Sequence, residues 1–532
     1  MRFREHLPGV PRAETAQNDA RFFEMPLDHF GNTKGTFKNR YWVNDTYYKP
    51  GGPVFLFDSG EQNAEPLLPY YLQEYHGLSA TMRLAKRYNG VAILWEHRYY
   101  GDSLPFPVNE NTTADQWQFL TTEQALEDVV FFANRFSLSS HQASDDAIAN
   151  SSSVNPLHPS RTPWVWLGGS YPGVRGALLR VRNPETIFAV WASSAPVHAQ
   201  VDMAAYYKAA ERSLTRNCSA DWVAVTRFVD NTLRNGRPEE AADLKFRLLS
   251  ARSDDVTRES AANASDISAA GVLMDPLSFY QYYGFEASVL PFCNVLETRN
   301  STITPFETGL SDNLGIDVAL DAFLTAIREV NYDAIPGSPD DPVQDRSWMR
   351  QYCSEYGFYQ RGDPNNPLSI ETSFRSLERF QEECNAAFPG SLPPSPAVEK
   401  VNKYGGWNMT PSNVLFTNGE FDPWRTMGLA SIEENSPQRK PSVAIPQCNV
   451  APEFPSFFGL THADMVHVSD LRVLLTPDAN HTDFKTVGFY SPVSQEPFYS
   501  GLGLFELALD EWLPCFGKSD LGKSSEERVM ET

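Results

Sequence analysis

Ser170 lies in a stretch whose residue types and order could support nucleophilic chemistry. An apolar run at 164–167 leads into the residues GGSYPG at 168–173, and 174–181 then has helical character. A buried strand, a sharp turn that carries a serine, and a helix that starts at that serine are typical of a nucleophile elbow. The G-x-S-x-G signature is met except at its last position, where Pro172 replaces glycine. Because proline is tolerated in the first turn of a helix, the stretch still predicts an elbow; the alternative is a glycine-rich turn with an ordinary serine.

A serine nucleophile needs an imidazole to take its proton and a carboxylate to orient that imidazole. On an α/β-hydrolase sheet these groups follow the serine in the order acid, then histidine. Asp422 follows a strand-like run at 413–417, although an aspartate before proline is also a common turn former. Three histidines come later: His467, which precedes a helix-like segment and is ranked first, His462, ranked second, and His481, which lies in a glycosylation sequon.

The remaining parts of such a site can be assigned by role. An oxyanion hole takes the N–H of the residue after the nucleophile, Tyr171, and a second N–H from a loop after an earlier strand, where Gly60 and Glu61 lie. Aromatic side chains could line a substrate pocket, although packing in the core is an equal alternative for two of them. These candidates are Trp424, Tyr99 and Tyr100.

The elements that must position these residues alternate between strand and helix. Strand-like apolar runs at 54–57, 91–95, 164–167 and 188–192 alternate with helix-like segments at 78–88, 121–135 and 174–181. This alternation predicts an α/β fold with a parallel sheet. Helix-like segments then dominate from 200 to 399, at 201–215, 221–234, 315–330 and 372–387, before strand character returns at 413–417 and a last helix follows at 502–512.

These patterns predict a discontinuous chain organisation. We expect 20–199 and 400–516 to form one sheet domain, 200–399 to form a helical insertion, and the charged residues 517–532 to be disordered. The 532 residues are 41% hydrophobic, which is enough for large cores, and carry a net charge of 44 − 67 = −23. Such a charge argues against nucleic acid and anionic membranes as partners. No apolar run reaches the ~18 residues of a membrane span, and no signal peptide is visible at the N-terminus.

The cellular compartment is inferred from cysteines and sequons. Six cysteines without a C-x-x-C pair favour disulfides over zinc, and no metal or cofactor is predicted. They are Cys218, Cys293, Cys353, Cys384, Cys448 and Cys515. Eight N-x-S/T sequons indicate a secreted or lysosome-like glycoprotein. They begin at Asn44, Asn111, Asn150, Asn217, Asn263, Asn300, Asn408 and Asn480.

Several sequence blocks together resemble the serine peptidase family S28, which contains lysosomal Pro-Xaa carboxypeptidase, dipeptidyl peptidase II and secreted fungal prolyl peptidases. The most specific blocks are EHRYYG at 96–101 and NGxxDPW at 418–424. The others are LDHF at 27–30, RYWxN at 40–44, GGP at 51–53, LTTEQAL at 120–126, GGSY at 168–171 and HxxDL at 467–471. The resemblance therefore extends from residue 27 to residue 471, nearly the whole chain.

The resemblance implies an α/β-hydrolase fold with a helical cap inserted after the nucleophile region, and Ser170, Asp422 and His467 as a catalytic triad. It also implies cleavage next to proline, commonly at acidic pH. Two disulfides of the cap, Cys218–Cys293 and Cys353–Cys384, resemble those of the family, which leaves Cys448 and Cys515 as a third pair. The chain departs from the family at Pro172 and in a Pro-rich segment at 436–456, which has the character of an added loop.

The leading hypothesis is thus a serine peptidase that acts on proline-containing peptides or proteins. A carboxylesterase or lipase on the same fold would share the triad, and a binding protein would keep the fold without catalysis. The sequence leaves open whether cleavage proceeds from the carboxyl end, from the amino end or internally, and it leaves the oligomeric state open.

Overall fold

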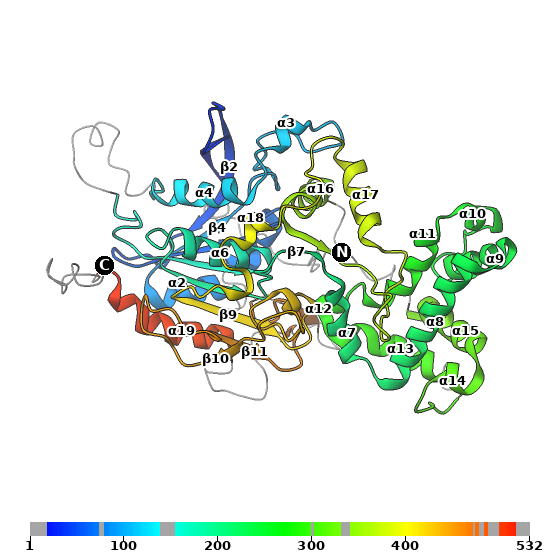
Figure 1. Ribbon diagram of the computed structural model, residues 1–532. Helices are drawn as coiled ribbons and strands as arrows, with labels where there is room; N and C mark the ends of the chain where they lie inside the picture. Colours follow the sequence, from blue (N-terminus) through cyan, green and yellow to red (C-terminus); the bar gives the residue numbers. More distant parts are fainter. Residues whose placement is uncertain are drawn as a thin grey trace.

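A nine-stranded, mostly parallel sheet organises the protein (Figure 1). The computed structural model describes residues 19–73, 79–138, 155–298, 303–330, 341–471 and 500–517, and the backbone of 474–477 and 484–487. The strand order is β1-β2-β4-β3-β5-β6-β9-β11-β10; β2 pairs antiparallel with β1 and β4, and all other pairs are parallel. The strands are β1 (Arg21–Pro26), β2 (Thr36–Asn44), β3 (Val54–Asp58), β4 (Val91–Trp95), β5 (Trp164–Gly169), β6 (Ala189–Ser193), β9 (Val414–Gly419), β10 (Lys440–Ser442) and β11 (Ser456–His462).

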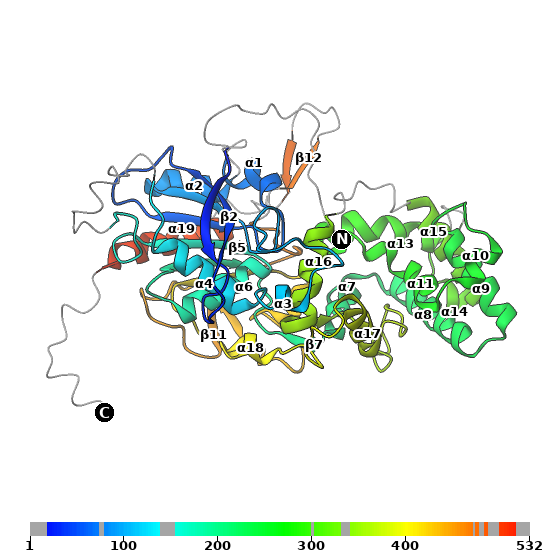
Figure 2. The same cartoon turned by 90° about the horizontal axis from the view of Figure 1, so that it is seen from above.

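Helices cover both faces of this sheet (Figure 2). On one face lie α4 (Thr122–Ala133) and α6 (Tyr171–Arg182), and on the other lie α2 (Ala80–Tyr88) and α19 (Gly501–Trp512). The central parallel strands are therefore buried on both sides, which explains their uninterrupted apolar runs. Short helices lie at α1 (Leu68–Tyr71), α3 (Ala114–Trp117) and α18 (Glu399–Asn402), and β12 (Leu474–Pro477) pairs antiparallel with β13 (Phe484–Val487).

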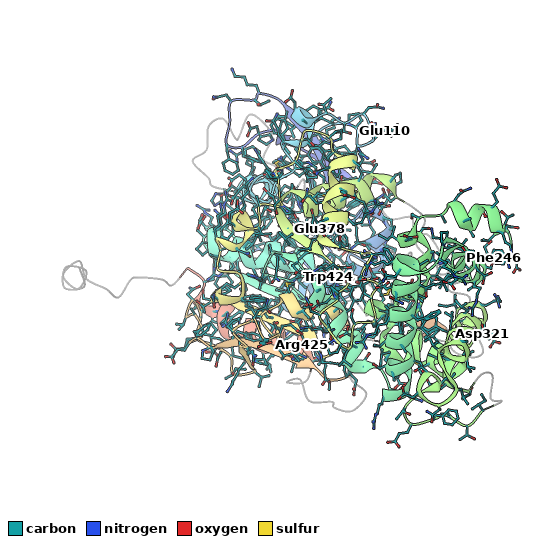
Figure 3. All side chains as sticks on the ribbon, turned by 45° about the vertical axis from the view of Figure 1, so that its right-hand side comes forward. Glu110, Phe246, Asp321, Glu378, Trp424 and Arg425 are labelled. Carbon is teal, nitrogen blue, oxygen red and sulfur yellow. A yellow bond between two sulfur atoms is a disulfide. The ribbon has the colours of Figure 1, made fainter. Side chains whose placement is uncertain are left out.

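A second body of helices is formed by the middle of the chain, at the right in Figure 1. Its helices are α7 (Lys208–Ser213), α8 (Arg216–Asn235), α9 (Pro238–Ser250), α10 (Arg258–Asn263), α11 (Asp266–Ala270), α12 (Tyr280–Gly284), α13 (Leu290–Thr298), α14 (Leu310–Leu314) and α15 (Ile316–Val330). Most of them pack around an apolar core of their own that includes Trp222 and Phe323. Figure 3 labels Phe246 and Asp321 in this body. The later helices α16 (Pro342–Gln351) and α17 (Leu377–Ala387) pack instead in an apolar cluster with Tyr99 and Trp117.

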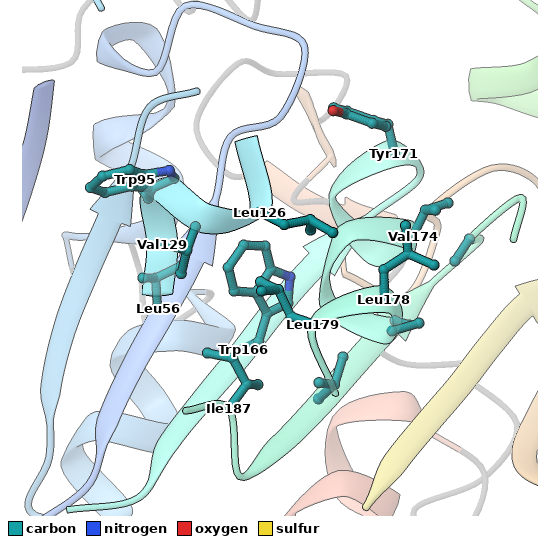
Figure 4. Packing of buried hydrophobic residues seen from close by; sticks show 14 of the residues in the cluster. Leu56, Trp95, Leu126, Val129, Trp166, Tyr171, Val174, Leu178, Leu179 and Ile187 are labelled. Atoms are coloured by element: carbon teal, nitrogen blue, oxygen red, sulfur yellow. The ribbon is translucent and has the colours of Figure 1, made fainter. Parts of the chain in front are cut away.

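The nucleophile region is fixed by close packing between β5, α4 and α6 (Figure 4). Trp166 of β5 faces Leu126 of α4 and Leu179 of α6, and its indole N–H donates to the carbonyl of Pro172 (2.9 Å). A Cβ at Gly176 would lie 2.4 Å from the Trp166 ring, so α6 approaches the sheet at van der Waals distance. This packing leaves the N-terminal end of α6 at the carboxyl edge of the sheet.

The predicted α/β-hydrolase fold and the mid-chain helical region are confirmed, with local corrections. In the nine-stranded sheet, the strands β1, β10 and β11 were not predicted. The expected helix at 201–215 begins instead with β7 (Gln200–Asp202), which pairs with β8 (Gly357–Tyr359), and the helix expected at 372–387 begins at Leu377. Residues 518–532 lie outside the described residues. Among the helices that the structure describes, none has the length and hydropathy needed to cross a membrane.

Candidate active site

Ser170 stands at the tip of a tight turn between β5 and α6. Its φ of 64° and ψ of −129° are strained for a residue with a side chain. At Gly168 a Cβ would lie only 2.5 Å from the carbonyl carbon of Pro172, so the turn requires glycine there. Pro172 is in the first turn of α6, where a missing N–H removes no helical hydrogen bond. The turn therefore has the geometry of a nucleophile elbow despite the proline.

His467 and Asp422 form a buried hydrogen-bonded pair at the same edge of the sheet. Asp422 follows β9 and is fully buried, and its Oδ1 lies 2.9 Å from Nδ1 of His467. The same oxygen accepts the N–H of Trp424 (2.9 Å), and Asn418 Nδ2 is 3.4 Å from the other oxygen. A carboxylate at Nδ1 keeps the proton on that nitrogen. The Nε2 of a neutral His467 is thus left with a lone pair that can accept a proton.

The loop that carries His467 lies directly against the elbow. A Cβ on Gly169 would approach Cγ1 of Val468 to 2.5 Å, so the residue before the serine touches the residue after the histidine. The end of β6 bonds to both segments: the carbonyl of Ser193 accepts the N–H of Ser170 (2.7 Å), and Oγ of Ser194 accepts the N–H of Val468 (2.8 Å). The structure thus brings the predicted serine, histidine and aspartate to one edge of the sheet.

The second-ranked histidine, His462, has a different carboxylate partner. It is the last residue of β11, and its Nε2 lies 3.2 Å from Oδ2 of Asp470 rather than near Asp422. The segment expected to be an added loop, 436–456, leads into β11 and contains the short strand β10. His481 lies outside the described residues.

The oxyanion-hole candidates lie beside the first turn of α6. Tyr171 is the first residue of the helix, so its N–H has no acceptor within the helix. Gly60, with a φ of +61°, packs so closely that a Cβ there would lie 2.3 Å from the ring of Pro172. The N–H of Gly60 donates to Oδ1 of Asp58 (3.2 Å).

A buried ion pair ties the same loop to the elbow helix. Nη1 of Arg175, on α6, lies 2.6 Å from Oδ2 of Asp58, and its Nη2 donates to the carbonyl of Ala125 (2.8 Å). Burial raises the pKa of Glu61 to about 7, and the negative charge of Asp58 also raises it. Oε2 of Glu61 is buried and has no hydrogen-bond partner among the described residues.

Aromatic rings from both parts of the chain form a wall beside His467. Trp424, which is labelled in Figure 3, has its ring centroid 6.1 Å from that of His467, 5.6 Å from Tyr206 and 5.2 Å from Phe358. The contacts continue from Phe358 to Tyr356 (5.8 Å). Trp424 was predicted from sequence, whereas the mid-chain members were missed because no local pattern distinguishes them from core aromatics.

Gln281 of α12 is a second residue that the sequence did not reveal. Its carbonyl accepts the N–H of His467 (3.1 Å). Its Oε1 accepts the hydroxyl of Tyr206 (2.7 Å) and lies 3.2 Å from the indole nitrogen of Trp424. The mid-chain region therefore contributes directly to the placement of the histidine, and no feature of the sequence around Gln281 indicates this.

Tyr100 belongs to a directional hydrogen-bond chain rather than to an open pocket. Nδ1 of His97 must donate to the carbonyl of Arg98 (2.6 Å), so its Nε2 accepts the hydroxyl of Tyr171 (2.9 Å). Nε2 of Gln351 donates to the Tyr171 hydroxyl (2.8 Å), and the hydroxyl of Tyr100 donates to Oε1 of Gln351. Burial holds the pKa of His97 well below its usual range. His97 is thus a neutral structural partner.

The expected pocket role of Tyr99 is corrected by the structure. Tyr99 is fully buried, stacks on Trp117 with 5.6 Å between ring centroids, and donates its hydroxyl to the carbonyl of Gln116. It belongs to the apolar cluster that surrounds the Cys353–Cys384 disulfide. Tyr100 is also fully buried. Neither ring is open to a substrate in this structure.

Three disulfides join Cys218 to Cys293, Cys353 to Cys384 and Cys448 to Cys515, the pairs that the family resemblance implies. The sequon asparagines differ in exposure. Asn111, Asn263 and Asn408 are exposed, Asn217 is half-buried, and Asn150, Asn300 and Asn480 lie outside the described residues. Asn44 is corrected as a glycan acceptor, because its buried side-chain amide donates to the carbonyl of Leu72 (2.9 Å).

The sheet topology and the elbow define an α/β hydrolase. Residues 25–451 match the family model described as "Serine carboxypeptidase S28". This chain therefore belongs to the S28 family of serine-type peptidases. The match ends before His467.

Curated relatives are consistent with this membership. The chain is 28% identical to "Serine protease vicPb" of Bipolaris victoriae, over 80% of this chain and 81% of that protein. It is 30% identical to the "Thymus-specific serine protease" of Mus musculus, over 82% and 83%. It is 24% identical to the "Lysosomal Pro-X carboxypeptidase" of Bos taurus, over 78% and 79%.

Proposed function

We propose that this serine peptidase hydrolyses peptide bonds next to proline through a triad of Ser170, His467 and Asp422. The observation that carries the proposal is the contact between the strained serine turn and the loop of a histidine that is itself bonded to a buried aspartate. A strained turn presents the serine hydroxyl, and the buried pair supplies a correctly protonated base.

In the proposed reaction, Nε2 of His467 accepts the proton of the Ser170 hydroxyl as Oγ attacks the carbonyl carbon that follows proline in the substrate. The protonated imidazole is stabilised by Asp422 and then gives its proton to the leaving amine, so that the C–N bond breaks and an acyl-enzyme remains. Water, deprotonated by His467, releases the acid and regenerates Ser170. The oxyanion accepts the N–H of Tyr171 and an N–H of the Gly60–Glu61 loop.

Proline preference is supported by the aromatic wall. A proline ring is compact and apolar and has no N–H to satisfy, so aromatic faces such as those of Trp424 and Phe358 are suitable neighbours. The printed name of the bovine relative, a Pro-X carboxypeptidase, supports the same substrate class.

An acidic, extracellular or lysosome-like working environment is part of the proposal. Three disulfides are consistent with the secretory pathway. Relatives carry the words "extracellular" and "lysosomal" in their names. A net charge of −23 keeps the chain highly charged at neutral pH, and protonation at low pH relieves this self-repulsion.

Labelling with a fluorophosphonate tests the nucleophile. The wild type is expected to be labelled and Ser170→Ala is expected to lose both labelling and peptidase activity, by a factor of ~10³ or more. Ser103→Ala is a matched control, because Ser103 is a buried serine whose hydroxyl donates to Glu96 (2.8 Å). Labelling that survives in Ser170→Ala would move the nucleophile elsewhere.

A panel of X-Pro fluorogenic peptides, free or blocked at each end, tests the substrate class. Cleavage of peptides blocked at the amino end only, at the carboxyl end only, or at both ends would identify carboxypeptidase, dipeptidyl aminopeptidase or endopeptidase action respectively. Hydrolysis of simple esters with no cleavage of any proline peptide would favour the esterase alternative.

A further inference from the structure

Asp470, three residues after His467, forms hydrogen bonds to the ends of two strands of the sheet, β6 and β11. Its Oδ1 accepts the hydroxyl of Ser193 at the end of β6 (2.6 Å), and its Oδ2 lies 3.2 Å from Nε2 of His462 at the end of β11. Thr417 of β9, the strand between β6 and β11, also lowers the pKa of this carboxylate. A Cβ on Gly501, the first residue of α19, would lie 2.3 Å from Oδ2. One carboxylate thus ties the histidine loop to the ends of two strands, β6 and β11.

The loop between His467 and Asp470 is strained and needs such anchors. Val468 has a φ of 55°, which is a true outlier for a β-branched residue. Its N–H is held by Ser194 Oγ, and Oγ of Ser469 both accepts the N–H of Val466 (3.1 Å) and donates to its carbonyl (2.9 Å). A strained backbone persists only where the surrounding contacts over-determine it.

The dipeptide Ser193-Ser194 links this anchored loop to the nucleophile. The carbonyl of Ser193 accepts the N–H of Ser170, whereas its hydroxyl donates to Asp470. Ser193 is fully buried and its hydroxyl faces a carboxylate rather than an imidazole, which excludes it as a second nucleophile. Ser193 therefore contacts both the backbone of Ser170, through its carbonyl, and the histidine loop, through its hydroxyl.

The electrostatics match this anchoring role. Burial alone would raise the pKa of Asp470, but the hydrogen bond and charge of His462, together with the hydroxyls of Ser193 and Thr417, hold it below its usual range. The carboxylate therefore stays ionised and accepts hydrogen bonds from both Ser193 and His462. His462 and Asp470 are almost fully buried, so water competes little for these contacts.

We propose that Asp470 and His462 are positioning residues, which hold the His467 loop in register with Ser170 through the Ser193–Asp470 bond. Because a serine–histidine pair must be aligned within a fraction of an ångström, release of this anchor should lower the chemical rate more than substrate binding. The inference rests on the proposed function, in which His467 is the base.

The test compares His462→Leu, which removes the donor to Asp470, with His462→Gln, whose amide can still donate an N–H to it. We expect kcat on an X-Pro peptide to fall tenfold or more in His462→Leu with KM within twofold of the wild type, and most of the rate to return in His462→Gln. Ser193→Ala should lower kcat by threefold or more, again with little change in KM. Fluorophosphonate titration gives the number of folded active sites in each sample.

The matched control is His29→Leu. His29 forms a similar buried pair with Asp128 (2.8 Å). It follows β1, at the edge of the sheet opposite β10, so the His29→Leu substitution should leave kcat per active site unchanged. The proposal is overturned if His462→Leu keeps kcat within twofold of the wild type, or if His462→Gln is as slow as His462→Leu. If His462→Leu does not fold, Ser193→Ala decides instead, and kcat within twofold of the wild type in that variant overturns the proposal.

The proposed substrate class and the positioning role of His462 can be rejected independently of each other. If the wild type cleaves no proline peptide, the proposed substrate class is wrong. The rate of fluorophosphonate attack on Ser170, which requires only the serine and its base, then measures the effect of the His462 variants. Equal labelling rates in the wild type and in His462→Leu would reject the positioning role.

Discussion

Glu61 is the titratable group next to the loop that the proposed reaction uses for its oxyanion. It lies beside Gly60, its Oε2 has no partner among the described residues, and burial raises its pKa to about 7. The charged groups that act on it are Asp58 and Arg175, which are already paired with each other. Below about pH 7 the carboxyl is neutral. Above about pH 7 the ionised carboxylate places a negative charge near the site where the negative charge of the oxyanion develops.

We therefore predict that Glu61→Gln extends activity toward higher pH. Since Glu61 ionises as the pH rises through about 7, its contribution to activity is present below that pH and lost above it. The ratio of kcat at pH 8 to kcat at pH 5 should be about tenfold higher in the variant than in the wild type, because the charge of the ionised carboxylate opposes the negative charge that develops on the oxyanion.

Glu371→Gln is the control for this prediction. Burial also raises the pKa of Glu371 to about 7, but it lies in the mid-chain region beside Arg375 and Tyr207. Its removal should leave the pH profile of kcat unchanged. Identical alkaline limbs for the wild type and Glu61→Gln would show that Glu61 does not govern activity.

At the scale of elements, α13 contains another buried carboxyl group whose pKa is raised. Glu297 is almost fully buried, and burial followed by the charge of Asp221 raises its pKa to about 8. Asp221, on α8, accepts the N–H groups of Leu310 (2.6 Å) and Ser311 (2.7 Å) at the start of α14. Three helices therefore meet at two carboxyl groups, of which one is neutral over much of the pH range.

This arrangement predicts that the helical body is more stable in acid. The folded pKa lies above the unfolded value of 4.5, so the stabilisation is fully present below pH 4.5 and is lost as the pH rises through about 8. Glu297→Gln should raise the free energy of unfolding at pH 8 by about 1–3 kcal/mol and change it little at pH 4. Urea unfolding at both pH values measures this, and the exposed Glu259→Gln should show no such difference. An equal effect of Glu297→Gln at both pH values would contradict the assignment.

At the scale of the whole molecule, the sheet and the mid-chain helices have separate apolar cores. The Cys218–Cys293 disulfide joins α8 to α13 inside the helical core and spans 75 residues. Replacing both cysteines by serine should destabilise the helical body by about 2–4 kcal/mol, because the conformational entropy of the unfolded segment increases when the cross-link is removed. Thermal unfolding should then show the helical body melting before the sheet.

The Cys448–Cys515 pair supplies the comparison. It joins the segment before β11 to the end of α19, so its loss should lower the unfolding temperature of the sheet rather than that of the helices. The same unfolding trace for both double variants would show that the two cores melt as one unit.

Much of the site could be predicted from residues that are close in sequence. The elbow at Ser170 follows from a strand, small residues and a helix in immediate succession, and the turn at Asp422 follows a strand in the same way. These two turns can be predicted because they depend on the backbone preferences and burial of residues that are neighbours in the sequence. The interleaved apolar runs likewise determined the parallel sheet, since each run must be buried on both faces.

Contacts between distant segments could not be predicted in this way. Whether His467 or His462 meets Asp422 depends on β11, an unpredicted strand that places His462 beside Asp470 instead. The same holds for Gln281, which bonds to His467 from a distant helix, and for Asn44, whose sequon is buried beneath Leu72.

The sequence by itself determined the class of chemistry, the family and the parallel sheet, because these depend on residue types and on local order along the chain. Only the tertiary structure decided which histidine is paired with which carboxylate and which aromatic rings stand beside it. Those choices depend on which strand ends become neighbours, and that adjacency results from packing among elements far apart in the chain.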